Sequence, residues 1–221
     1  MVERAGASLL VHGTDWNRLD ITDVQARRLL TERKPTSYRE GEPRPEHYLD
    51  YFHAGLVVSP DARRVAEDGW VWHPVGVTRT WSLQDWTERN VWESEDGPSQ
   101  RSLTQHDYFW DAPMCWLSET ELAVWGIGDD DDWMTPGVRV FDAETGRQLR
   151  EFGGPMGHLA FDGYLFSFST AFGTAVWDPI SGEQLVAAPE LQLLAYHPAD
   201  QGFLRRDDDG AFALAKLVGR G

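Results

Sequence analysis

The chain has 221 residues, of which 41% are hydrophobic; this is enough to build a core and excludes a globally disordered protein. Acidic residues outnumber basic ones by 36 to 20, which gives a formal charge of −16. A field of this sign repels phosphate groups, so we expect neither nucleic acid nor an anionic membrane as a partner. The charge instead favours a basic protein or peptide.

No stretch of about 18 apolar residues that could form a membrane helix occurs in the sequence. The polar N-terminal residues do not resemble a signal peptide. The single cysteine, Cys115, lies in an apolar run, where we expect a buried space-filling side chain. These features predict a cytoplasmic protein. Lys34 and Lys216 are the lysines of the chain, and this preference for Arg, with frequent Ala, Gly and Pro, favours a bacterial source.

One short pattern recurs along the chain: an apolar strand end, an Asp, a turn and a second apolar strand. A loose copy without glycine covers residues 20–30, and a degenerate copy covers residues 79–86. Two nearly identical copies, VFDAETGRQL and VWDPISGEQL, cover residues 140–149 and 176–185. The Asp can cap the backbone of the turn, and Gly supplies a positive φ. The pattern therefore predicts antiparallel hairpins.

The apolar strands that precede each copy extend the hairpins into five units. In chain order we expect these units at residues 7–31, 51–92, 114–152, 158–186 and 193–217. The first of them shows no innermost strand.

The run VWD followed by SG and Leu resembles the turn between the third and fourth strands of WD-type β-propeller blades, and the chain is similar to WD-repeat-like propellers. The resemblance implies an all-β fold, a small β-propeller of about five blades with mostly four antiparallel strands, in a single domain over residues 1–221. Four closed blades or an irregular β-sandwich stay as alternatives. Helices should be few, because Gly and Pro interrupt the chain often.

Two connections between the expected blades, residues 35–50 and 93–107, are much longer than the others. In propellers of the kind that this chain resembles, such connections emerge on the same face as those between the middle strands. Here the middle connections are residues 73–76 and 126–133. Long loops on a rigid scaffold often bind ligands. We therefore expect a site on this face, around the mouth of the central channel.

Both long connections end in His, acidic and aromatic residues, which suit sugars or cationic side chains. The candidate binding residues there are His47, Tyr51, Phe52, His53, His106, Tyr108, Phe109, Trp110 and Asp111. Those on the middle connections and at the start of the fourth blade are Trp72, His73, Asp130, Asp131, Asp132, Trp133 and His158. An alternative is that Tyr51, Phe52, Tyr108 and Phe109 pack beneath their own loops.

The acidic run at residues 129–132 lacks the EF-hand spacing, and the histidines lack the short spacing of metal motifs. We therefore predict neither a metal site nor a cofactor.

The leading hypothesis for function is a non-enzymatic binding or scaffold module that recognises a protein or peptide, expected to be cationic, on the loop-rich face. The sequence has no G-x-S-x-G motif for a nucleophile. One alternative is a glycoside-hydrolase-like enzyme that uses Asp50 and Asp111 as its carboxylates, together with His53. Another is a binder of small ligands or glycans at the central channel.

Overall fold

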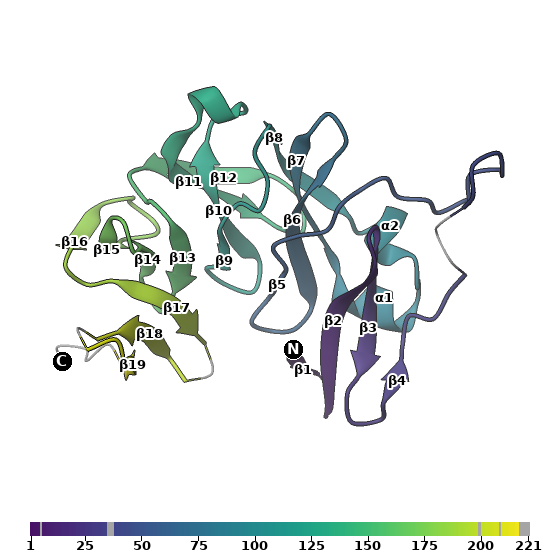
Figure 1. Cartoon of the computed structure of the whole chain (residues 1–221), viewed down its shortest axis with the longest axis horizontal. Coiled ribbons are helices and arrows are strands. Elements are labelled where there is room, and N and C mark those ends of the chain that lie inside the picture. Colours follow the sequence, from purple (N-terminus) through teal and green to yellow (C-terminus); the bar gives the residue numbers. More distant parts are fainter. Residues whose placement is uncertain (5, 35–37, 199, 208, 217–221) are drawn as a thin grey trace.

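The computed structural model describes residues 1–221 except 5, 35–37, 199, 208 and 217–221. Its strands form five antiparallel sheets, arranged as the blades of a five-bladed β-propeller (Figure 1), which confirms the predicted fold class. Within each blade the strands lie side by side in chain order. In the part of the chain that is described, no helix is long and apolar enough to cross a bilayer.

The blades are made of the following strands. Blade 1 contains β1 (Val2–Arg4), β2 (Ala7–Asp15), β3 (Arg18–Asp23) and β4 (Arg28–Leu29). Blade 2 contains β5 (Val57–Val58), β6 (Arg64–Val71), β7 (Val75–Ser82) and β8 (Arg101–Asp107). Blade 3 contains β9 (Met114–Trp116), β10 (Glu121–Ile127), β11 (Thr135–Asp142) and β12 (Gln148–Gly153). Blade 4 contains β13 (His158–Phe161), β14 (Leu165–Ser169), β15 (Gly173–Trp177) and β16 (Gln184–Ala188). Blade 5 contains β17 (Leu193–His197), β18 (Gly202–Arg206) and β19 (Phe212–Ala215).

The recurring Asp turns join the last two strands of three blades. Asp142 Oδ1 accepts hydrogen bonds from the backbone N–H groups two and three residues later, and Asp178 Oδ1 accepts the same pair. The glycines four residues after these Asp residues have φ values of 76° and 73°. After Asp23 the same position is Arg27, whose φ is 51°. The turn geometry is thus kept in the copy that lacks glycine, at some conformational cost.

Residues 79–86 do not form the expected hairpin, because a helix follows β7 directly. This helix, α1 (Leu83–Glu88), begins at Ser82, whose hydroxyl accepts a hydrogen bond of 3.0 Å from the Asp85 backbone N–H. Trp81 and Trp86 are fully buried against each other, with ring centroids 5.7 Å apart. Burial of two indoles therefore fixes the helix against the sheet.

The stretch at residues 93–107, expected to be a long loop, is also regular structure. It contains α2 (Glu93–Asp96) and the outer strand β8 of blade 2. The expected outer strand ending near residue 92 is therefore wrong. Blade 1 has an additional strand, because β1 pairs with β2 where the sequence showed no innermost strand.

The described residues form a core of four hydrophobic clusters, each of which combines residues of two consecutive blades. Their members include Ile21 with Trp81 for blades 1 and 2, Ala66 with Met114 for blades 2 and 3, Val138 with Leu159 for blades 3 and 4, and Phe166 with Phe203 for blades 4 and 5. Cys115 is buried in the third of these clusters, and burial raises the pKa of its thiol to about 12. Among the described residues, no such cluster joins blade 5 to blade 1.

Candidate functional site

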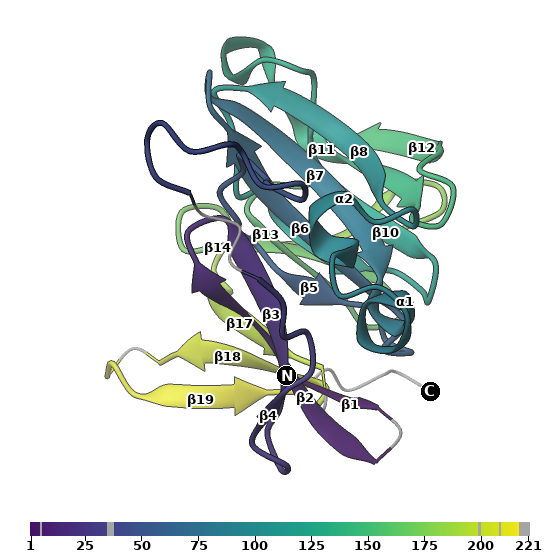
Figure 2. The same ribbon diagram turned by 90° about the vertical axis from the view of Figure 1, so that its right-hand side faces the viewer.

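Several chain segments meet on one face of blades 1 to 3. They are the turns between β2 and β3, between β6 and β7 and between β10 and β11, together with the linkers that lead into β5 and β9 (Figure 2). Residues 35–37 of the first linker lie outside the described residues. The remaining part of this linker supplies aromatic side chains that contact the neighbouring turns, as shown next.

Aromatic side chains from four of these segments form a continuous row. We call the following residues the aromatic row: Tyr38, Tyr48, Trp16, Phe52, Trp70, Trp72 and Trp110. At its centre, Phe52 and Trp70 stack with ring centroids 4.1 Å apart and planes at 10°. Trp70 also contacts Trp110 at 5.4 Å and Trp72 at 5.9 Å. On the other side of Phe52, the Trp16 ring lies 5.0 Å away.

Much of this row is open to solvent. Trp72 is 67% exposed, Trp16 41% and Trp110 40%. Phe52, Trp72 and Trp110 are candidates from the sequence that the structure brings together. The other four members were not predicted, because Tyr38 and Tyr48 of the linker, Trp16 of the β2–β3 turn and Trp70 of β6 belong to no motif. The aromatic residue in the β2–β3 turn of blade 1 is the signal that could have identified Trp16.

Backbone contacts hold the row in place. The linker residue Phe52 pairs with Trp70 through two N–H···O bonds of 2.8 and 3.0 Å. The approach is close because position 69 is glycine: a Cβ on Gly69 would lie 2.2 Å from the Phe52 carbonyl oxygen. The linker is therefore held against β6 by an isolated bridge at Phe52 and is not a free loop there.

Two candidates of the same linker, Tyr51 and His53, lie in the interior instead. Tyr51 is 1% exposed, and its hydroxyl donates to the Val77 carbonyl and accepts from the Gly69 N–H. His53 Nδ1 lies 2.7 Å from Glu67 Oε2. Successive residues of an extended segment point to opposite sides, so Phe52 faces outward and its neighbours face inward.

Glu67 is fully buried, between His53 and Arg79, which also pairs with it. Burial by itself raises the pKa of Glu67, but the charge and hydrogen bonds of Arg79 and His53 outweigh it and hold the pKa below its ordinary value. The Arg79 guanidinium also lies 3.9 Å from the Tyr51 ring centroid. This network supports the linker from beneath and is closed to solvent.

His106 also lies in the interior, on the outer strand β8 and not at the start of an inner strand. Its Nε2 contacts the Arg139 guanidinium, and the Phe109 ring centroid lies 5.9 Å from its own. Burial and the neighbouring Arg139 lower the pKa of His106 to about 4. Phe109 packs against the cluster between blades 2 and 3. His106 is fully buried, and Phe109 is partly buried.

The acidic run forms an exposed loop beside the row. A short 3-10 helix, η1 (Asp131–Trp133), follows Asp130, whose carboxylate accepts a 3.0 Å bond from the Asp132 N–H. The Trp133 side chain is 79% exposed. The Asp107 N–H donates to the Asp129 carbonyl at 2.8 Å, so the loop is attached to the end of β8. The adjacent Tyr108 is 65% exposed and binds the Pro74 carbonyl through its N–H.

The remaining candidates are dispersed. His47 precedes Tyr48 of the row, but its ring stacks on Trp92 at 4.3 Å and pairs with Asp96. His158 belongs to blade 4 and contacts the Phe168 ring. His73 lies in the β6–β7 turn with φ of 122°.

Asp50 and Asp111, the carboxylates of the hydrolase alternative, are both exposed. The carboxylates that the structure buries are others, such as Glu67 and Asp68. Among the described residues, no group of three or more His, Cys, Asp or Glu side chains is placed to hold a metal ion.

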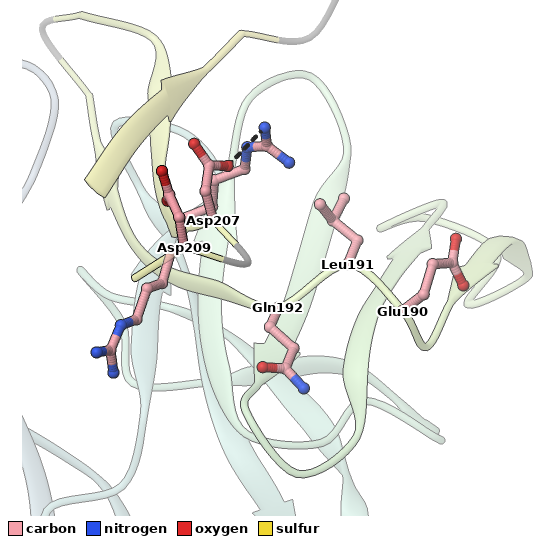
Figure 3. Close-up of a pocket in the computed structure, with 7 residues that line it drawn as sticks. Glu190, Leu191, Gln192, Asp207 and Asp209 are labelled. Atoms are coloured by element: carbon pink, nitrogen blue, oxygen red, sulfur yellow. Dashed lines mark ion pairs between the residues drawn. The ribbon is translucent and has the colours of Figure 1, made fainter. Parts of the chain in front are cut away.

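A separate polar pocket of about 520 Å³ lies between blades 4 and 5 (Figure 3). It is lined by Glu190, Leu191, Gln192, Arg205, Arg206, Asp207 and Asp209. Arg205 and Asp207 form an ion pair of 2.8 Å at its edge. This pocket could not be predicted from the sequence, because its residues come from a linker and a hairpin with no common motif.

Comparison with known proteins gives no family and no function. No family model matches the chain, and no curated protein matches it. Among solved structures, one titled "Structure of U3-55K" matches with 15% sequence identity and a TM-score of 0.49, over 90% of this chain. The chain spans 54% of the length of that structure. A likeness at this level of identity concerns the fold alone.

Proposed function

We propose that this chain is a binding module that holds a protein or peptide with cationic side chains against the aromatic row. The observation that carries the proposal is the exposure of Trp16, Trp72 and Trp110 on one continuous row of rings that contact one another. Exposed indole rings with a firm backbone support are typical of binding hot spots. Ring faces also attract guanidinium and ammonium groups.

The charge beside the row supports a cationic partner. The acidic loop at residues 129–132 is attached to the end of β8, and the segment at residues 107–111 leads from there to Trp110. Carboxylates next to aromatic faces attract basic groups and repel acidic ones. The overall charge of −16 acts in the same direction over longer distances.

An array of immobilised peptides rich in Arg, in Lys, in neutral residues or in Glu would test the proposal. We expect the intact chain to bind basic peptides and to lose this binding as salt is raised. The double variant Trp72→Ala with Trp110→Ala should weaken binding about tenfold or more, because it removes two central rings. Replacing both Asp131 and Asp132 by Asn should weaken it less.

The matched control is Tyr164→Ala, which removes a 51% exposed ring from the turn between β13 and β14. This variant should bind like the parent chain, and circular dichroism should show that all variants are folded. Equal binding to basic and acidic peptides, or equal binding by the tryptophan variant and the Tyr164 variant, would contradict the proposal.

Three finer expectations belong with this proposal. We infer WD-type blades from the Asp turns at Asp142 and Asp178. The cytoplasm as compartment rests on the single buried cysteine, and the bacterial source rests on the preference for Arg over Lys.

A further inference from the structure

The outer end of the aromatic row contains a pocket of about 510 Å³. It is lined by Trp16, Tyr38, Glu40, Gly41 and Tyr48. The Tyr38 and Tyr48 rings meet edge to face, with centroids 5.1 Å apart, and Trp16 meets Tyr48 at 6.3 Å. Three rings and one carboxylate therefore border the same space. Rings in this arrangement provide negative faces, to which the carboxylate adds a full charge.

An arginine of the chain itself already uses one of these rings. The Arg44 guanidinium carbon lies 4.5 Å from the centroid of the Tyr48 ring, and Arg44 Nη2 lies 3.5 Å from the Tyr48 carbonyl oxygen. The side chain of Arg44 is exposed, so this contact is not enforced by a packed core. The local geometry is thus suited to a planar guanidinium group.

We propose that this pocket takes an arginine side chain of the partner, with its guanidinium against the rings and its N–H groups directed to Glu40. Arg44 is not among the lining residues, but it occupies the Tyr48 ring when no partner is bound and so competes for that ring. A guanidinium suits the site better than an ammonium because it can stack on a ring and pair with a carboxylate in its own plane. The inference rests on the proposed function, since it names the side chain that the row recognises.

The test uses the full chain and a peptide of four Arg-Gly repeats, with an otherwise identical peptide that carries citrulline in place of arginine. Citrulline keeps the planar shape and removes the charge. We expect the arginine peptide to bind and to shift the indole N–H resonance of Trp16, assigned with a Trp16→Phe variant. Glu40→Gln should weaken binding roughly two- to fivefold, as expected for an exposed cation site.

The decisive comparison is between Arg44→Ala and Arg39→Ala. Both remove one positive charge from the same segment, but only Arg44 lies over the Tyr48 ring. We expect Arg44→Ala to strengthen binding of the arginine peptide roughly two- to fivefold more than Arg39→Ala does, because only the first variant frees a ring.

Equal strengthening by both variants, or equal binding of the citrulline peptide, would overturn the inference. If the arginine peptide is lost from the Trp72→Ala, Trp110→Ala chain but is unaffected by Glu40→Gln and Arg44→Ala, the inference fails while the proposed function stands. If no basic peptide binds the intact chain, both fail.

Discussion

Two buried titratable groups of blade 2, Asp68 on β6 and His106 on β8, respond to pH in opposite directions. Burial raises the pKa of Asp68 to about 6, although hydrogen bonds from the Thr78 hydroxyl and the Ala112 N–H partly oppose this. Burial and Arg139 lower the pKa of His106 to about 4. As the pH falls from about 6.5 to 4, His106 takes up a proton in the unfolded chain before it does so in the folded chain, and the folded state loses stability. Asp68 acts in the opposite direction, because the folded chain takes up a proton at Asp68 before the unfolded chain does.

The His106→Gln variant should therefore have a different pH dependence of stability. In the parent chain, His106 accounts for about 3 kcal/mol of unfolding free energy that is present at pH 7 and lost by pH 4, from the shift between 6.5 and about 4. The variant loses stability at neutral pH, but it lacks this loss on acidification. The stability difference between parent and variant should shrink by about 3 kcal/mol from pH 7 to pH 4, as measured by urea unfolding.

The control is His197→Gln, which removes an exposed imidazole paired with Asp200. A difference between parent and His106→Gln that stays constant over this pH range would show that His106 is not buried as a neutral group.

At the scale of elements, the aromatic row depends on how closely the linker approaches β6. Gly69 carries no Cβ, and an added one would lie 2.2 Å from the Phe52 carbonyl oxygen and 2.5 Å from the Tyr51 ring. The backbone pairing of Phe52 with Trp70 and the position of their stacked rings both require this approach. A side chain at position 69 would therefore both destabilise the fold and change the shape of the candidate site.

We expect Gly69→Ala to destabilise the protein by about 1–3 kcal/mol, as overpacking does, and to shift the rings of the row. Thermal unfolding measures the first effect, and near-ultraviolet circular dichroism of the tryptophans measures the second. The control is Gly13→Ala, also in a strand, where an added Cβ would meet no heavy atom closer than 3.9 Å. Unfolding temperatures that change equally in both variants would contradict this account.

The element that differs most from the sequence expectation is the outer part of blade 2. The run at residues 79–86 has the Trp and Asp of the hairpin pattern, yet Ser82 caps a helix there. The turn pattern is weak without glycine, and burial of Trp81 with Trp86 favours the helix. The local sequence has only a small preference between a hairpin and a helix here, so tertiary packing decides in favour of the helix.

At the scale of the whole molecule, the described residues provide four junction clusters for five blades. Blade 5 is attached through the cluster that includes Phe166 and Phe203, and its outer strand β19 has Phe212 69% and Leu214 62% exposed. Blade 2, in contrast, belongs to the clusters on both of its sides and contains the buried network around Glu67. Stability should thus be uneven around the propeller.

We expect hydrogen exchange under native conditions to show blade 5 opening before blade 2. The amides of β18 should exchange faster than those of β6, because fewer buried contacts must break to release them. Mass spectrometry of peptides that cover residues 202–206 and 64–71 provides the measurement. If the amides of β18 are protected from exchange as well as those of β6, or better, then blade 5 does not open before blade 2, which would contradict this prediction.

The sequence by itself determined the features that depend on near neighbours. The Asp turns, the glycines with positive φ and the strands of alternating polarity involve contacts within a few residues, so the hairpins and about five units could be predicted. The resemblance to WD-type blades implied their arrangement as a propeller. Only the tertiary structure decided which side chains the site contains. Phe52 faces outward while Tyr51 and His53 face inward, and Trp16 joins Phe52 across 36 positions of the chain because the linker packs on β6. Such contacts depend on how blades meet, which no local pattern encodes.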